Sequence, residues 1–128
     1  MLCVLFLFCS LIVNQRTAPT YDDYVARYLP NVFIAHNALD GQYFGEIKID
    51  AMIRYYDGTW TDYKVTDILQ MQAIPPDSIT AILFDGVNSY SATWVHNNIY
   101  DKDLVLQTCI YKDGNWNWGR LFIVAEKQ

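Results

Sequence analysis

The sequence predicts an all-β domain, an antiparallel meander of about seven strands that closes into a small barrel or a two-layer sandwich, preceded by one short helix. Four of the six glycines directly follow an aspartate, and Asp57-Gly58, Asp85-Gly86 and Asp113-Gly114 recur at intervals of 28 residues. Asp-Gly between apolar runs is typical of hairpin turns. The chain is also 16% aromatic, with ten Tyr and four Trp, and these residues favour strands.

A short helix is expected first, over residues 20–30. Thr20 and Asp23 form a capping pattern at its start, where acidic side chains suit the positive end of the helix dipole. Pro30 ends the helix, because proline cannot continue it.

Polar and apolar side chains alternate after the helix. This alternation predicts strands at 43–50 and 51–56, and it favours a strand at 63–73 over a helix at 66–72. The remaining strands are expected at 79–84, 88–96, 104–112 and 115–125, with a polar loop at 97–103. Because every connection is short, consecutive strands should pair antiparallel, and the sheet should close or fold over to hide its edges.

The N-terminus predicts secretion. Residues 2–13 are apolar except for one Ser, a stretch too short to span a membrane and suited to the core of a signal peptide. We therefore expect a signal peptide over residues 1–18 and a single β domain over 19–128, secreted and without a membrane span in its mature form. A buried N-terminal strand is the alternative.

Cysteine usage fits removal of this segment. Cys3 and Cys9 lie inside it, so Cys109 would be the single cysteine of the mature chain and no intramolecular disulfide could form. Cys109 stands in an apolar run, which predicts a buried and unreactive thiol. A disulfide between two chains is the alternative.

Charge and composition exclude several classes of function. Nine Lys and Arg stand against fourteen Asp and Glu, and no two basic residues are adjacent, so we expect no nucleic-acid partner. His36 and His96 have no further His or Cys at ligand spacing, so neither a metal site nor a cofactor is expected. Asn97, Asn98, Asp101 and Asp103 lack the pattern of an EF-hand and predict a solvated loop.

A repeated Asp-Gly-x-Trp pattern provides the candidate binding residues. A Trp just beyond a tight turn lies at the rim of a sheet, where its ring can stack on a sugar while Asp and Asn bind hydroxyl groups. Packing of the aromatic side chains in the core is the alternative. The candidate ligand-binding residues are Asp57, Trp60, Asp113, Asn115, Trp116 and Trp118.

These patterns predict a secreted, non-enzymatic, lectin-like module that binds glycans. Gly58-Thr59-Trp60 and Gly114-Asn115-Trp116 are similar to the Gly-x-Trp of lipocalin- and avidin-like barrels, a likeness of three residues that identifies no family. The high aromatic and aliphatic content allows a second possibility, a calycin-like barrel that carries a small apolar ligand. A protein-binding inhibitor or effector is the third possibility. An enzyme comes last, because a nucleophilic site would need Cys109 or a Ser together with a distant histidine.

Overall fold

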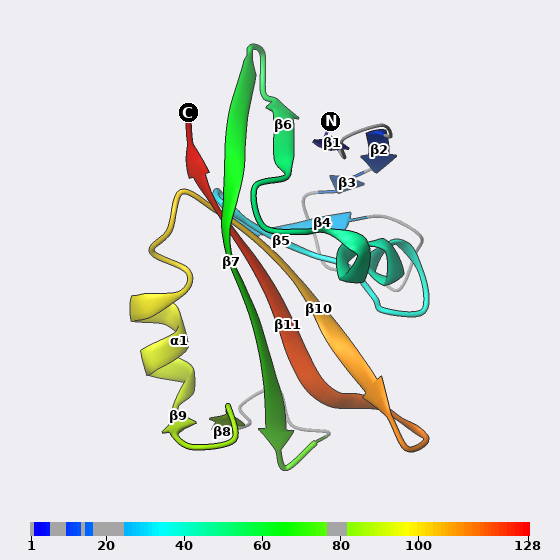
Figure 1. The fold of residues 1–128 in the computed structure, drawn as a ribbon, viewed down its shortest axis with the longest axis vertical. Helices are drawn as coiled ribbons and strands as arrows, with labels where there is room; N and C mark the ends of the chain where they lie inside the picture. The colour runs from blue at the N-terminus through cyan, green and yellow to red at the C-terminus, as the bar shows by residue number, and fades with distance from the viewer. Residues whose placement is uncertain (1, 6–9, 14, 17–24, 77–81) are drawn as a thin grey trace.

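The computed structural model describes the whole chain except residues 1, 6–9, 14, 17–24 and 77–81 (Figure 1). One sheet dominates it, in the order β2-β1-β6-β7-β11-β10-β5-β4-β3, with β8 paired to β7 and β9 paired to β8. The strands are β1 (Leu2–Leu5), β2 (Ser10–Val13), β3 (Gln15–Arg16), β4 (Val25–Leu29), β5 (Val32–Ile34), β6 (Met52–Tyr56), β7 (Trp60–Ile74), β8 (Ile82–Phe84), β9 (Ser89–Tyr90), β10 (Leu104–Lys112) and β11 (Asn115–Lys127).

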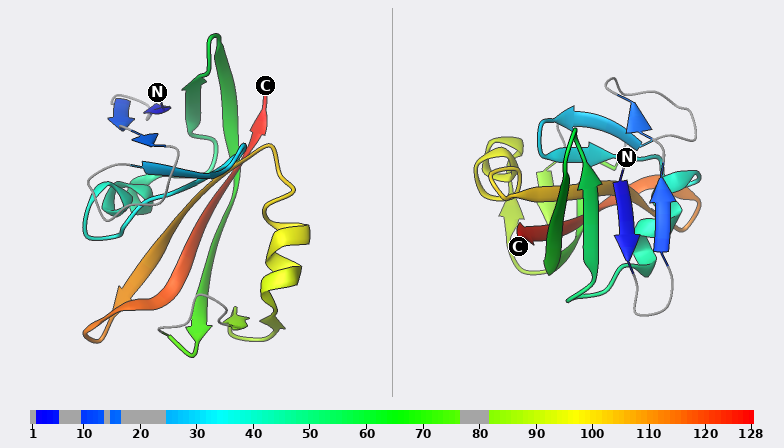
Figure 2. Two further views of the ribbon diagram at one scale, coloured as in Figure 1. Left: turned by 180° about the vertical axis from the view of Figure 1, so that it is seen from behind. Right: turned by 90° about the horizontal axis from the view of Figure 1, so that it is seen from above.

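The sheet curls into an open half-barrel, which is plain when the molecule is viewed from above (Figure 2). The prediction of an all-β fold is therefore confirmed. Two short helical elements accompany the sheet in the described part of the chain, the 3-10 helix η1 (Asp40–Glu46) and the α-helix α1 (Ala92–Asn98).

The Asp-Gly turns lie where the sequence predicts chain reversals. At Asp113-Gly114, between β10 and β11, both residues have positive φ (51° and 83°), as a type I′ turn requires. Gly58 and Gly86 also have positive φ, of 82° and 101°. The β6–β7 and β10–β11 hairpins follow from this local turn chemistry together with the alternation of the flanking residues.

Several predicted elements are wrong. Residues 25–29 of the predicted helix form β4 instead, because they pair with β5 to extend the sheet, and residues 20–24 lie outside the described residues. The first half of the strand predicted at 43–50 lies in η1, and residues 47–50 are not in a strand. The strand predicted at 88–96 stops early and α1 begins, because the Ser91 hydroxyl caps the helix by accepting the Trp94 N–H.

The sheet is also not a simple meander. β5 runs parallel to β10, and β3 runs parallel to β4. A parallel pairing of this kind joins segments that are far apart in sequence, so no turn motif announces it.

Both faces of the sheet are buried, each under one helical element. Phe44 of η1 and Ile47, directly after it, pack on the face that carries Leu106 and Ile123. Val95 of α1 and Ile99, directly after it, pack on the other face, against Val105 and Phe122. We call this second surface the α1 face. Within the described residues, no helix is long and apolar enough to span a membrane.

Candidate functional site

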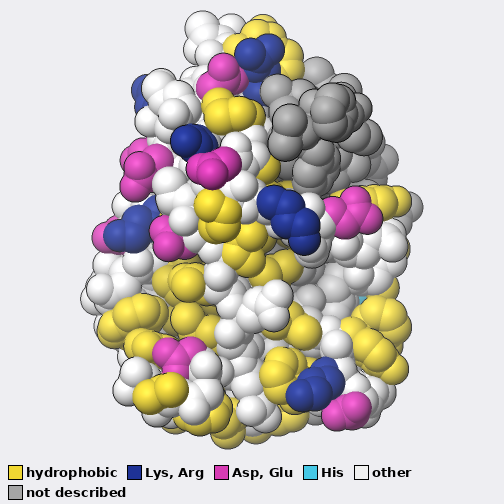
Figure 3. All heavy atoms as spheres, viewed as in Figure 1, with side chains coloured by type: hydrophobic (Ala, Val, Ile, Leu, Met, Phe, Trp, Pro, Cys, Tyr) yellow, Lys and Arg dark blue, Asp and Glu magenta, His cyan; other side chains and the backbone are white. Residues whose placement is uncertain are grey.

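The aromatic residues predicted to bind a ligand lie at opposite ends of the sheet. Asp57 and Trp60 are at the tip of the β6–β7 hairpin, whereas the Asp113 to Trp118 segment forms the tip of the β10–β11 hairpin (Figure 1). The structure therefore does not bring the six residues into one site. On the face seen in Figure 3, hydrophobic side chains are scattered among polar ones instead of forming one platform.

The tryptophans at the two tips pack on neighbouring aromatic rings. Trp60 and Trp116 are each 50% exposed, so neither is a core residue. The Trp60 ring centroid lies 5.1 Å from that of Tyr56, and the Trp116 centroid lies 4.6 Å from that of Tyr111. Trp118 is half-buried beneath the Lys112 ammonium, which lies 4.6 Å from the ring centroid.

A different group of side chains converges on the α1 face. Cys109 of β10 and Arg120 of β11 are directly opposed in the antiparallel pair. Opposed residues project to the same side of a sheet. Val105 lies four residues before Cys109 on β10, and Phe122 lies two residues after Arg120 on β11. Residues an even number of positions apart on a strand point to the same face. Val105 and Phe122 belong to the core beneath α1, so Cys109 and Arg120 project to that side.

β5 brings a histidine to the same end of β10. The parallel register runs from Val32 opposite Val105 to Ile34 opposite Gln107. His36 is two residues after Ile34, and Cys109 is two residues after Gln107. If the parallel register continued by two residues, His36 would therefore be opposite Cys109.

Two hydrogen bonds extend this pairing beyond the end of β5. The Ala35 N–H donates to the Gln107 carbonyl oxygen across 3.1 Å, and the buried Thr108 hydroxyl donates to the Ala35 carbonyl oxygen across 2.8 Å. Ala35 is thus fixed to the residue directly before Cys109. Extended by one residue, this register sets the backbone of the exposed His36 alongside the Cys109 position of β10.

The loop after His36 is held by several contacts. The Gly41 N–H donates to the His36 carbonyl oxygen across 3.0 Å, and the Ala38 N–H donates to His36 Nδ1 across 3.1 Å. The Asn37 side-chain amide donates to the Trp116 carbonyl oxygen across 2.9 Å. The imidazole is therefore oriented by its own loop, and the loop is tied to the β10–β11 hairpin.

The electrostatics of Cys109 reflect partial burial beside a positive charge. Burial raises the pKa of its thiol, and the Arg120 guanidinium partly offsets the rise. The guanidinium is anchored by Nη1, which donates to the Gly119 carbonyl oxygen across 2.9 Å. A neutral thiol next to a fixed positive charge needs a base to become a thiolate, and the charge then stabilises the thiolate.

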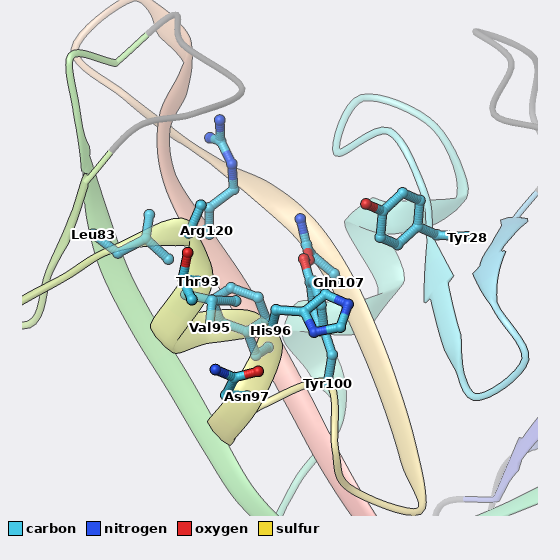
Figure 4. A pocket seen from close by; sticks show the side chains of 11 residues that line it. Tyr28, Leu83, Thr93, Val95, His96, Asn97, Tyr100, Gln107 and Arg120 are labelled. Atoms are coloured by element: carbon cyan, nitrogen blue, oxygen red, sulfur yellow. The ribbon is translucent and has the colours of Figure 1, made fainter.

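A pocket of about 400 Å³ opens between α1 and the sheet next to these residues (Figure 4). Gln107 and Arg120, which flank Cys109 on the sheet, line it together with Phe122. His96 and Tyr100 contribute from α1 and the turn that follows. Cys109 itself does not line the pocket, which lies next to the two residues that flank the thiol.

The polar floor of the pocket is a Tyr100–Gln107 pair. The Tyr100 hydroxyl donates a hydrogen bond to Gln107 Oε1. Burial is the main cause that raises the pKa of Tyr100 to about 12, so the hydroxyl keeps its hydrogen at neutral pH.

Reasoning from the sequence missed the pairing of His36 with Cys109. It treated Cys109 as buried and the histidines as isolated, whereas Cys109 is only partly buried and has Arg120 opposite. One usable signal was present, because His36 and Cys109 each stand near the end of an apolar run of the kind that forms buried strands. In the described part of the chain, no group of three or more His, Cys, Asp or Glu side chains is placed to hold a metal ion.

No protein-family model and no curated protein matches the chain. Among solved structures, the chain is similar to the X-ray structure of sortase C from Clostridium perfringens SM101, with a TM-score of 0.46 and 22% identity. The match covers 76% of this chain and 44% of that one, so the chain spans less than half of that protein's length.

This comparison corrects the functional prediction made from the sequence. The expectation of a non-enzymatic binding module, whether lectin-like, calycin-like or inhibitory, is wrong, because the similar solved structure is that of an enzyme. At this identity and TM-score the likeness carries no activity over to the chain. The described side chains must carry any functional argument by themselves.

Proposed function

We propose that the protein is an acyl-transfer enzyme in which Cys109 is the nucleophile, His36 exchanges protons and Arg120 stabilises negative charge. One observation carries the proposal: strand pairing opposes Arg120 to Cys109, and the β5–β10 register continues towards His36, next to a pocket that Arg120 lines. A nucleophile, a base and a fixed positive charge beside a cavity are the parts that covalent catalysis requires.

The geometry supports a two-step reaction. The Cys109 sulfur attacks a carbonyl carbon, a carbon–sulfur bond forms, and the thiol proton passes to His36 Nδ1, which gives up the hydrogen bond from the Ala38 N–H. The tetrahedral intermediate then collapses to a thioester, and His36 returns the proton to the leaving group. Water or an amine attacks the thioester in the second step and releases Cys109 as a thiol.

Arg120 serves both steps by its position. Arg120 is the strand partner of Cys109, and its positive charge would stabilise the thiolate before attack and the oxygen anion that develops afterwards. Because burial raises the pKa of Cys109, little thiolate exists at neutral pH, and proton removal by His36 is required for the reaction.

Acetylation of Cys109 by p-nitrophenyl acetate tests the proposal, with nitrophenol release giving the rate and peptide mass spectrometry locating the acetyl group. Cys109→Ala should abolish the reaction at this residue. His36→Gln should slow it by about a hundredfold, the usual contribution of a positioned base. His96→Gln is the comparison, since the second histidine lies on α1. Equal losses in the two histidine variants would refute the role of His36.

A further inference from the structure

Gln107 lies next to the proposed nucleophile. It precedes Cys109 by two residues on β10, so both side chains project to the α1 face, with Cα atoms about 6.7 Å apart at the ordinary rise of a strand. Gln107 also lines the pocket. A carbonyl bonded to the Cys109 sulfur on the pocket side would therefore lie within reach of the Gln107 amide.

Tyr100 decides which end of that amide faces the pocket. A glutamine amide has one oxygen, which accepts hydrogen bonds, and one NH₂ group, which donates them. The Tyr100 hydroxyl donates to Gln107 Oε1, so the oxygen is turned towards Tyr100. Figure 4 shows the Gln107 nitrogen pointing away from Tyr100, along the sheet towards Arg120.

Packing keeps Tyr100 in this position. Its ring makes edge contacts with Phe122 and Tyr28, at centroid distances of 6.3 and 6.0 Å. Within the described chain, the Tyr100 hydroxyl is the partner of the Gln107 side chain, and no acceptor is recorded for its NH₂ group. The two N–H hydrogens of Gln107 are thus presented to the pocket.

We propose that the Gln107 side-chain amide, oriented by Tyr100, donates a hydrogen bond to the oxyanion that forms when Cys109 attacks a carbonyl. This inference rests on the proposed function. It makes Gln107 a catalytic residue and Tyr100 a positioning residue. Gln107 thus provides a hydrogen-bond donor in addition to the positive charge of Arg120. A donor that is fixed in position stabilises the negatively charged transition state more than it stabilises the neutral carbonyl of the substrate.

The rival explanation is that Gln107 only fills space and anchors Tyr100. Two reagents that both modify Cys109 separate these roles. Acetylation by p-nitrophenyl acetate passes through a tetrahedral oxyanion, whereas alkylation by iodoacetamide displaces iodide at a saturated carbon and forms no such oxyanion. A structural role would affect both reactions, and an oxyanion role would affect acetylation alone.

The test measures both rates in the full chain carrying Gln107→Leu, with Gln70→Leu on the exposed part of β7 as the matched control. Gln107→Leu should slow acetylation by about tenfold to a hundredfold, up to the lower end of losses seen for one oxyanion donor, and leave alkylation within about twofold. Gln70→Leu should change neither rate. Equal slowing of both reactions, or unchanged acetylation, would overturn the inference.

Two further variants keep the test decisive if Gln107→Leu disturbs folding. Gln107→Glu retains an acceptor for Tyr100 but replaces the donor by a carboxylate, so acetylation should fall at least as far. Tyr100→Phe should slow acetylation by a smaller factor, because the amide loses its fixed orientation. Acetylation that depends on His36 but not on Gln107 would reject this inference alone, whereas independence from His36 would reject the proposed function.

Discussion

The Asn37 side-chain amide donates to the main-chain carbonyl oxygen of Trp116 across 2.9 Å. This bond joins two segments of the candidate site, the loop that carries His36 and the hairpin that carries Cys109 and Arg120. It acts through the backbone of Trp116, so the indole ring remains on the surface. This exposed hydrogen bond therefore adds to the contacts that set the relative position of base and nucleophile.

Asn37→Ala should therefore reduce acetylation of Cys109 severalfold, and it should slow iodoacetamide alkylation as well, because both reactions use the thiolate that His36 helps to form. The matched control is Asn98→Ala, because the Asn98 amide also donates to a tryptophan carbonyl oxygen, that of Trp94, across 2.9 Å. Both variants should lose about 1 kcal/mol of unfolding free energy in urea. Similar acetylation rates in the two variants would show that Asn37 does not position His36.

Gly41 is the second point where the His36 loop meets β10. A Cβ at this position would lie 2.4 Å from Thr108 Oγ1 and 2.7 Å from the His36 carbonyl oxygen. Gly41→Ala should thus destabilise the protein by about 1–3 kcal/mol, as overpacking does, and should reduce acetylation. Gly45→Ala in the same helix is the control, because no atom lies within 4 Å of its Cβ position. Chemical denaturation of both variants measures the difference.

The pH dependence of Cys109 alkylation reports its ionisation. Thiolate is the reactive form, and burial raises the pKa of Cys109, so the rate should keep rising above about pH 8.5, where an ordinary thiol is already half ionised. Arg120→Met removes the charge that offsets burial, so its profile should move further towards alkaline pH. A profile that shifts to lower pH in Arg120→Met would contradict the stated electrostatics.

Tyr100 should make the fold sensitive to alkali. Its pKa is raised to about 12 in the folded protein, mainly by burial, whereas the pKa of a tyrosine in an unfolded chain is about 10. The neutral phenol therefore contributes full stability below pH 10, and this contribution is lost as pH rises through 12. The expected loss is about 2–3 kcal/mol. Urea denaturation at pH 9 and pH 12 should show a smaller alkaline loss in Tyr100→Phe.

The two main hairpins could be predicted from the sequence because their information is local. Asp113-Gly114 supplies the residues of a type I′ turn, and the flanking strands alternate in polarity. The residues of η1 misled the same reasoning, since Tyr43 and Gly45 belong to the alternating pattern but lie in a 3-10 helix. Periodicity over so few residues does not separate the two conformations.

The candidate site depends on information that is not local. Ala35 and Thr108 are 73 residues apart and meet only because β5 inserts parallel to β10. Neither turn chemistry nor polarity specifies that pairing, so the proximity of His36 and Cys109 could not be derived from the sequence. The pairing of Arg120 with Cys109 could have been predicted from the sequence, because a single hairpin places the two residues opposite each other.

The most direct test compares the rate at which p-nitrophenyl acetate acetylates Cys109 in the native chain and in the same chain unfolded in urea, at one neutral pH. Peptide mass spectrometry separates Cys109 from Cys3 and Cys9. The raised pKa alone would make the native thiol slower than the unfolded one. A site built from His36, Arg120 and Gln107 predicts that the native thiol is faster. A slower native thiol would contradict the assignment of Cys109 as a nucleophile.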